Sequence, residues 1–374
     1  MAPAVGRLAR AATASLRRRT GTTPPAPDRS GFYAACDPGP GPRGAVLGAA
    51  PLDVAVAGAN GWRVRYRTLD AAGRPVAASA AIAVPAGIGP RPRPVAVWVH
   101  GAVGVAAGCG PSRTGLDAWY AAELVAAGAV VVAPDLTGLG MEGVGHPYLH
   151  GTTAGRSTLD AARAAAALTT AAAGSVVTLA GHSAGGFAVL WANQLAAGAD
   201  GEGLDVRLAV AMSPLADLAV AMAHLARTWG QAAFPVQVAA TWPDVEDVDP
   251  TAVLTPAAVD RCHHLRTGRL ARLVRTFGGD PQRWVRAEGF AHGAWAAALE
   301  RQSAGRSPGA APVVLVHGGA DDLPLRWTRQ LAAELPGTEL LTYPGADHMG
   351  VHDAARRDVV ERLVAALTGA AAHR

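Results

Sequence analysis

A serine lies between two glycines in the segment Gly181-His182-Ser183-Ala184-Gly185, which has the G-x-S-x-G pattern of a nucleophilic serine. The apolar run Val176–Ala180 precedes it, and an alanine-rich stretch with helical character follows it. In this context a sharp strand-to-helix turn holds the serine in a strained conformation with its hydroxyl exposed. The alternative is a chance match in a chain rich in glycine and alanine. The strand and helix around the motif favour Ser183 as a nucleophile.

The base and the acid that such a serine needs occur later in the chain, in the order acid and then histidine. Asp321 follows the apolar run Val313–Val316, and His348 follows the run Glu339–Tyr343. We predict that His348 takes the proton of the serine and that Asp321 fixes the orientation and tautomer of its ring. The adjacent Asp322 is the alternative for the acid.

Two backbone N–H groups should stabilise the negative oxygen that forms when a serine attacks a carbonyl. The first is that of Ala184, at the start of the predicted helix. The second is expected in the loop after the run Val95–Val99, where Ala102 or Val103 could donate. His100 and His317 each end a predicted strand before a glycine, and we expect structural roles for both.

The elements that would position these residues alternate between short apolar runs and alanine-rich helical stretches. This alternation predicts an α/β fold with a mostly parallel, doubly wound sheet, of the kind found in α/β-hydrolases. The first two strands have only a turn between them, so they should be antiparallel. The predicted strands are Trp62–Leu69, Val76–Val84, Val95–Val99, Val130–Ala133, Val176–Ala180, Arg207–Met212, Val313–Val316 and Glu339–Tyr343. The predicted helices are Leu116–Ala127, Thr158–Leu168, Gly185–Ala197, Trp327–Leu335 and Arg356–Leu367.

One long segment interrupts the alternation. Residues 215–309 contain no clear strand but several amphipathic patterns, and they are too many for a loop. We therefore predict a helical cap at 215–309, inserted between core segments at 31–214 and 310–374. Residues 1–30 are predicted to be a disordered tail rich in proline and arginine.

Composition excludes several classes of protein. The net charge of +4 comes from arginines that are scattered and do not alternate with aromatic residues, so we expect no nucleic-acid partner. The sequence has no apolar run of about 18 residues, so we predict no membrane-spanning segment. The three cysteines, Cys36, Cys109 and Cys262, are too few and too dispersed for a disulfide scaffold or a zinc site, and we expect no metal.

Several further runs have a recognisable pattern. They are Phe32-Tyr33, Gly44–Leu47, Trp98-Val99-His100-Gly101, Cys109-Gly110-Pro111-Ser112, Ala133–Gly140, His146-Pro147-Tyr148-Leu149 and Ser157–Ala164. From about residue 32 to the C-terminus, the chain resembles the secretory lipase family, the lipase A-like α/β-hydrolases. It differs from the family pattern at Gly110, where the family has Ala, and at Leu136, where it has Tyr. The resemblance implies a helical cap over the site and hydrolysis of carboxylic esters without a cofactor. It also implies a disulfide between Cys109 and Cys262, against the alternative of three reduced thiols.

The leading hypothesis is a lipase or carboxylesterase that forms an acyl-serine intermediate on an ester with a hydrophobic acyl or alcohol group. The alternative is an intracellular acyltransferase or ring-closing enzyme of specialised metabolism with the same three residues. A non-catalytic binding protein is a third possibility, which the complete Ser-Asp-His set opposes. The expected partners are a small-molecule ester or lipid and, transiently, a lipid interface. The resemblance implies export, whereas the first 30 residues lack the apolar middle of a signal peptide, which favours the cytoplasm.

Overall fold

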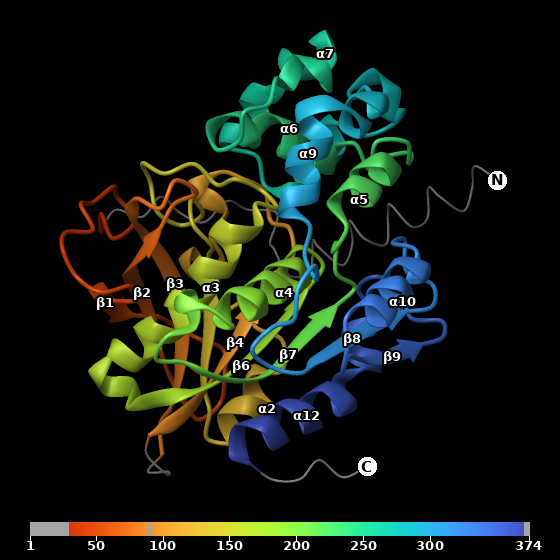
Figure 1. The fold of residues 1–374 in the computed structure, drawn as a ribbon. Helices are drawn as coiled ribbons and strands as arrows, with labels where there is room; N and C mark the ends of the chain where they lie inside the picture. Colours follow the sequence, from red (N-terminus) through yellow and green to blue (C-terminus); the bar gives the residue numbers. More distant parts are fainter. Residues whose placement is uncertain (1–29, 88–91, 370–374) are drawn as a thin grey trace.

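The computed structural model describes residues 30–87 and 92–369, and its strands form one sheet of nine in the order β1-β2-β3-β5-β4-β6-β7-β8-β9 (Figure 1). Each predicted strand lies within an observed one. The strands are β1 Val46–Pro51, β2 Ala59–Leu69, β3 Pro75–Pro85, β4 Arg93–Val99, β5 Val130–Pro134, β6 Ala173–His182, β7 Asp205–Met212, β8 Val313–Gly318 and β9 Glu339–Tyr343. Strand β1, at the edge of the sheet, was not predicted.

The sheet is antiparallel at one end and parallel over the rest. Strands β1, β2 and β3 pair antiparallel, as the turn between the first two predicted strands indicated, and β3 pairs antiparallel with β5. From β5 through β4, β6, β7 and β8 to β9 all pairings are parallel. The carboxyl ends of these six strands therefore meet along one edge of the sheet.

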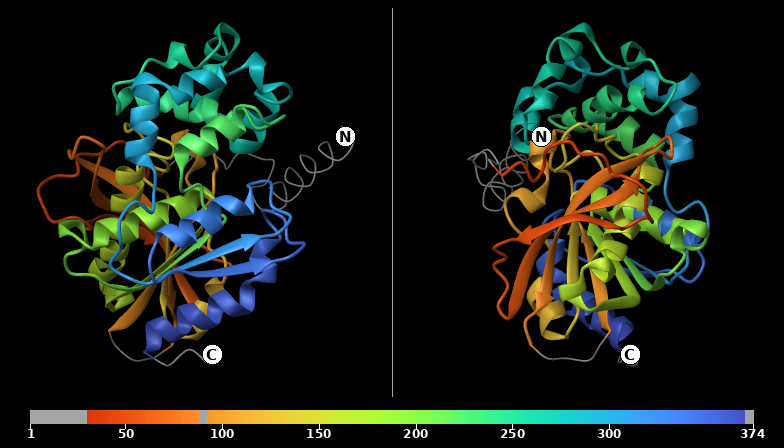
Figure 2. Two further views of the ribbon diagram at one scale, coloured as in Figure 1. Left: turned by 45° about the vertical axis from the view of Figure 1, so that its right-hand side comes forward. Right: turned by 90° about the vertical axis from the view of Figure 1, so that its left-hand side faces the viewer.

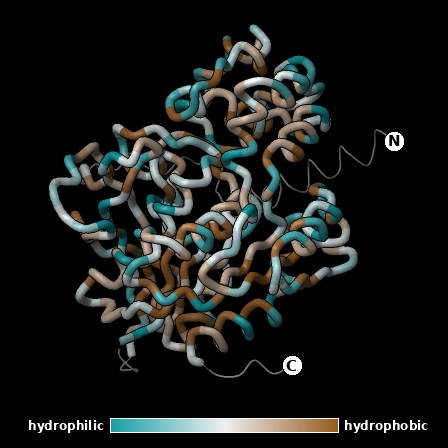
Figure 3. Tube along the Cα trace, viewed as in Figure 1, coloured by the Kyte–Doolittle hydropathy of each residue, from teal (hydrophilic) through white to brown (hydrophobic). Residues whose placement is uncertain are grey.

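Helices cover both faces of the sheet, and the strands alternate between two hydrophobic cores. In β4, Val95, Val97 and Val99 pack in the core beneath α3 and α4, whereas Ala96 and Trp98 pack in the core beneath α2 and α12. Side chains alternate across a strand, so a fully covered strand is apolar at every position. The hydrophobic parts of the trace accordingly gather in the sheet (Figure 3). The helices of the core are α2 Ala121–Ala126, α3 Gly151–Ala167, α4 Ala184–Ala196, α10 Leu325–Glu334, α11 Val351–Ala354 and α12 Arg356–Thr368.

Two predicted helices start more than two residues away from their predicted first residue. The helix predicted from Leu116 begins at Ala121, because Tyr120 takes a left-handed conformation with φ 63°. The helix predicted from Thr158 begins at Gly151, seven residues earlier. Its first N–H groups need acceptors from elsewhere, and the side-chain oxygen of Gln302 accepts the N–H of Gly151 at 2.8 Å.

Between β7 and β8 the described chain is helical, and we call the part from Leu218 to Gln302 the cap. It lies over the carboxyl edge of the sheet in all views (Figures 1 and 2). Its helices are α5 Leu218–Leu225, α6 Ala233–Thr241, α7 Pro256–Val259, α8 Leu270–Thr276 and α9 Gly293–Gln302, joined by short 3-10 turns. The domain bounds at 215 and 309 remain predictions. The predicted tail, apart from Ser30, lies outside the described residues.

The cap is attached to the core by hydrogen bonds on both sides of the sheet edge. The N–H of Tyr148 donates to Thr241 Oγ1 at 3.2 Å, and Trp242 Nε1 donates to the carbonyl oxygen of Tyr148 at 2.7 Å. At the end of α9, the carbonyl oxygen of Gln302 accepts a hydrogen bond from Trp191 Nε1 at 2.9 Å. The described part of the chain contains no helix with the length and hydrophobicity needed to cross a bilayer.

Candidate active site

Ser183 occupies a tight turn between β6 and α4. Its backbone has φ 58° and ψ −119°, a conformation that a non-glycine residue adopts only under strain. A side chain at Gly185 would collide with the carbonyl oxygens of Val99 and His100, so only glycine fits there. The N–H of Ser183 donates to the carbonyl oxygen of Met212 at 2.8 Å, which anchors the turn to β7.

The loops after β8 and β9 bring Asp321 and His348 together. Nδ1 of His348 lies 2.9 Å and 3.0 Å from the two carboxylate oxygens of Asp321. The Asp321 side chain is fully buried, and it also accepts hydrogen bonds from Ser213 Oγ at 2.6 Å and from the N–H of Leu323 at 2.8 Å. With Nδ1 donating to the carboxylate, Nε2 of the neutral ring is left as the proton acceptor.

The charges of this pair support each other. Burial alone would raise the pKa of the Asp321 carboxyl, but His348, Ser213 and Leu323 stabilise the ionised form and lower that pKa to about 2. Burial alone would lower the pKa of His348, but the Asp321 carboxylate outweighs burial and raises that pKa above its usual value. His348 is therefore a stronger base than a free histidine.

The other two acids of these loops do not take the place of Asp321. Asp322 is exposed, and the carboxylate that contacts His348 is that of Asp321. Asp347 accepts the N–H groups of Met349 and Gly350, at 3.2 Å and 2.6 Å, and so holds its own turn. The structure thus favours Asp321 over Asp322 as the partner of His348.

The histidines at the strand ends contact backbone carbonyl oxygens or the ring of His348. His317 Nε2 donates to the carbonyl oxygen of Leu323 at 2.9 Å, and His100 Nδ1 contacts that of Gly101 at 2.6 Å. His182 precedes Ser183, and the centroid of its ring lies 4.4 Å from that of the His348 ring. Burial, followed by the charges of His352 and His348, lowers the pKa of His182 well below its usual value. A neutral His182 therefore supports the ring of His348.

The predicted oxyanion donors lie beside the serine. Ala184 is the first residue of α4, so its N–H has no acceptor within the helix. The loop after β4 passes close by, since a Cβ on Gly101 would lie 3.7 Å from Cβ of Ser183. Ala102, Val103 and Ala184 line the same small cavity of about 20 Å³. The choice between the N–H groups of Ala102 and Val103 remains open.

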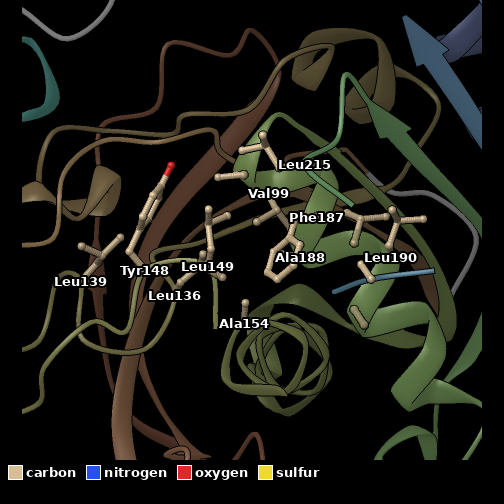
Figure 4. Close-up of a cluster of buried hydrophobic side chains, with 14 of the residues drawn as sticks. Val99, Leu136, Leu139, Tyr148, Leu149, Ala154, Phe187, Ala188, Leu190 and Leu215 are labelled. Atoms are coloured by element: carbon tan, nitrogen blue, oxygen red, sulfur yellow. The ribbon is translucent and has the colours of Figure 1, made fainter. Parts of the chain in front are cut away.

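Apolar side chains from three parts of the core close this small cavity. Leu136, Leu149 and Phe187 line it, and Figure 4 shows them packed together beside the start of α4. A larger cavity of about 790 Å³ lies between the core and the cap and shares one lining residue, His146, with the small one. Its walls include the β2–β3 turn, Val105, Ala106 and the cap segment 240–247.

The disulfide expected between Cys109 and Cys262 is absent, and both residues are free thiols, as is Cys36. The expectation was wrong because the two cysteines have other surroundings. Cys109 is buried with Sγ 3.7 Å from the carbonyl oxygen of Gly268, whereas Cys262 lines the larger cavity. Burial raises the pKa of both thiols, which keeps them protonated.

Sequence reasoning missed Ser213, whose hydroxyl donates to Asp321. It follows the last residue of β7 and has φ 43°, a left-handed value that aims its side chain at the loop after β8. The signal was the dipeptide Ser213-Pro214 at the end of an apolar run, because parallel strands place such positions along the same edge.

Comparison with known proteins agrees with this geometry. A family model described as the alpha/beta hydrolase family matches residues 96–362, a span that includes Ser183, Asp321 and His348. The chain belongs to the alpha/beta hydrolase family. A sequence search of curated proteins finds no match.

Solved structures of the same fold include a lipase and an esterase. Lipase A from Candida antarctica has a TM-score of 0.77 at 20% identity, over 92% of this chain and 86% of that one. The rice cell wall degrading esterase LipA from Xanthomonas oryzae has a TM-score of 0.70 at 18% identity, over 86% of this chain and 97% of that one. These matches confirm, at the level of fold, the resemblance to lipase A-like hydrolases found in the sequence.

Proposed function

We propose that this α/β-hydrolase cleaves carboxylic esters through an acyl intermediate on Ser183. The observation that carries the proposal is the pair of contacts at 2.9 Å and 3.0 Å between His348 Nδ1 and the buried Asp321 carboxylate, with the His348 ring packed against that of His182, the residue before the strained Ser183. A base fixed in this way, next to a serine at a strand-to-helix turn, is the arrangement that acyl transfer to serine requires.

In the proposed reaction, Nε2 of His348 removes the proton of the Ser183 hydroxyl as its oxygen attacks the ester carbonyl. The N–H of Ala184, with that of Ala102 or Val103, stabilises the oxyanion of the tetrahedral intermediate. The protonated His348, stabilised by Asp321, gives its proton to the departing alcohol. Water then attacks the acyl-serine with His348 again acting as the base.

The small cavity is closed by leucine and phenylalanine side chains. These walls favour a substrate with a hydrophobic group next to the scissile bond. Three of the four tryptophans of the cap add no support, because Trp242, Trp284 and Trp295 are buried in the hydrophobic core. Trp242 stacks on Trp295 with ring centroids 6.0 Å apart. We therefore propose an ester with an apolar acyl or alcohol group and leave chain length to experiment.

Labelling with a fluorophosphonate probe tests the proposal. The wild-type protein should be labelled covalently and the Ser183→Ala variant should not. A Ser213→Ala variant, which keeps the nucleophile, should still be labelled. Absence of labelling in the folded wild-type protein would show that Ser183 is not an activated nucleophile and would refute the proposal.

A series of p-nitrophenyl esters of increasing chain length then defines the substrate class. We expect release of nitrophenol in water without an added acceptor, and none from Ser183→Ala. Release only after an alcohol is added would instead identify an acyltransferase.

A further inference from the structure

The cap carries a cluster of exposed arginines without carboxylate partners. Between residues 260 and 286 the chain has seven arginines and only two acidic residues, Asp260 and Asp280. Six of these arginines are exposed and form no ion pair within the described residues. Arg286 bonds the carbonyl oxygens of Thr251 and Leu254, and Arg266 lines the larger cavity. We call the other four, Arg261, Arg272, Arg275 and Arg283, the arginine cluster.

The members of this cluster lie close together. The guanidinium groups of Arg261 and Arg283 lie 5.5 Å and 4.6 Å from the ring centroid of Trp284. Arg272 approaches Nδ1 of His264 at 3.3 Å, and Arg275 lies one turn further along α8. Desolvation, followed by the positive charges of His263, Arg272 and Arg261, lowers the pKa of His264. Arg261 and Arg283 therefore share one ring, and Arg261 and Arg272 both lie near His264.

Six exposed arginines elsewhere in the described residues form ion pairs, whereas Arg326 and Arg329 of α10 do not. Arg74 bonds Asp70 at 2.8 Å, Arg207 bonds Asp205, and Arg357 bonds Glu361 at 2.8 Å. The two acids in the cluster's own segment do not neutralise it. Asp280 accepts the N–H of Gln282 at 3.0 Å, and neither Asp260 nor Asp280 forms an ion pair within the described residues. A surface of unpaired arginines attracts an anionic partner.

The large hydrophobic side chains that are exposed within residues 30–87 and 92–369 are Val220, Trp229 and Val259, and all three belong to the cap. Trp229 is 62% exposed and Val259 is 47% exposed. Val259 ends α7, two residues before Arg261, at the outer end of the cap (Figure 1). Trp229 lies beside Gly279, and the N–H of Gly230 donates to the carbonyl oxygen of Gly279 at 2.8 Å. Trp284 Nε1 donates to the carbonyl oxygen of the adjacent Gly278 at 3.0 Å. Apolar side chains thus flank the arginine cluster.

We propose that this face of the cap binds an anionic lipid surface, with the arginine cluster against the headgroups and Trp229 and Val259 in the interface. Tryptophan favours the boundary between water and lipid, because its ring is apolar and its N–H is polar. Exposed aliphatic and indole groups beside the arginines favour lipid over nucleic acid, which would need bases stacked on several aromatic rings. The docked face would turn the cap, and the sheet edge beneath it, toward the lipid.

Sedimentation with vesicles tests this proposal on the full chain. The Ser183→Ala variant should bind vesicles containing phosphatidylglycerol, should bind vesicles of phosphatidylcholine alone more weakly, and should be released by salt. Because Ser183→Ala carries out no ester cleavage, failure of vesicle binding is distinguishable from failure of the proposed function. Equal binding to both kinds of vesicle would overturn the proposal.

Two matched triple variants separate the cluster from net charge. Arg261→Gln with Arg272→Gln and Arg275→Gln should weaken binding to phosphatidylglycerol vesicles on the order of 100-fold, because each arginine near an anionic surface contributes about fivefold. Arg74→Gln with Arg207→Gln and Arg357→Gln removes the same charge from the core and should weaken binding far less. Trp229→Ala should also reduce binding. The two triple variants and Trp229→Ala, made in the protein that retains Ser183, should keep the wild-type rate on a water-soluble ester, which shows that they are folded.

If the two triple variants weakened vesicle binding equally, binding would depend on net charge alone and the proposal would be overturned. Binding of the wild-type protein to duplex DNA but not to vesicles would assign the cluster to nucleic acid and would also overturn it.

Discussion

His348 can act as a base only when its ring is neutral, so its pKa sets the pH range of the proposed reaction. The Asp321 carboxylate raises that pKa above 6.5, and the neighbouring carboxylates of Asp322 and Asp347 act in the same direction. As the pH falls through the raised pKa, His348 is protonated and loses the ability to accept the proton of Ser183. Activity should therefore be lost at a higher pH than the usual titration of histidine would give.

We expect kcat/KM on a water-soluble ester to rise with pH through a midpoint above 6.5. The variant Asp322→Asn removes one of the facing negative charges but not the contact to Nδ1, so it should remain active with a lower midpoint. The measurement is a pH profile of kcat/KM for both proteins. A wild-type midpoint at or below 6.5 would contradict this account of His348.

At the level of the elements, the turn between β6 and α4 depends on glycines that pack against neighbouring strands. A Cβ on Gly185 would meet the carbonyl oxygens of Val99 and His100, which are backbone atoms that side-chain rotation cannot move aside. The turn at Ser183 and the chain at the end of β4 are therefore in direct contact, and a change in one displaces the other.

We predict that Gly185→Ala lowers the free energy of unfolding by about 3 kcal/mol or more and abolishes labelling of Ser183. Gly198→Ala, just after the end of the same helix, is the control. A Cβ there would meet only the carbonyl oxygen of Leu195, at 3.8 Å, so stability should change little. Thermal unfolding and fluorophosphonate labelling of the two variants provide the comparison. Equal stability of both variants would show that the turn can relax.

Sequence patterns predicted most of the sheet, because a strand covered on both faces is apolar along its length. Strand β1 escaped prediction, since its residues Val46–Pro51 include Gly48 and a proline and lie at the sheet edge, half exposed. The early start of α3 was also missed. Gly151 begins that helix because a side chain of the cap, Gln302, accepts its N–H, and such a distant partner leaves no trace in the local pattern.

For the site, the order of Ser183, Asp321 and His348 could be predicted because each follows a strand of one parallel sheet. The choice between Asp321 and Asp322 required coordinates, since neighbouring side chains point in different directions. Ser213 was missed because its hydrogen bond to Asp321 depends on a left-handed turn and on a distant loop, so the dipeptide Ser213-Pro214 marked the position but not its partner.

In the whole molecule, the cap and the core are joined through a buried carboxylate. Glu246 of the cap accepts hydrogen bonds from Gln302 Nε2 at 2.8 Å and from Arg301 at 2.7 Å, and lies 3.5 Å from His150 Nε2 of the core. Burial alone would raise its pKa, but these partners lower it to about 2. Its ordinary value is 4.5, so the junction holds a carboxylate that resists protonation.

Because the folded-state pKa of Glu246 lies below its unfolded value, its contribution to stability is complete above pH 4.5 and is lost as the pH falls toward 2. We expect Glu246→Gln to lower the unfolding temperature at neutral pH, and the difference from wild type to shrink across that window. Glu288→Gln, at an exposed pair with Arg227, should have little effect at any pH. Thermal unfolding at a series of pH values tests this. A difference that is constant from pH 6 to 2 would exclude the ionised carboxylate as its source.

The two hydrogen bonds between the cap and the backbone of Tyr148 limit how the cap could be replaced by that of another hydrolase. The cap is continuous in sequence, yet the N–H and carbonyl oxygen of Tyr148 are satisfied by Thr241 and Trp242. A chimera that received a foreign cap at residues 218–302 alone would leave both buried groups without partners, at a cost of about 1–3 kcal/mol each. The unit of exchange is therefore discontinuous, and a workable graft would carry the loop around Tyr148 along with the cap.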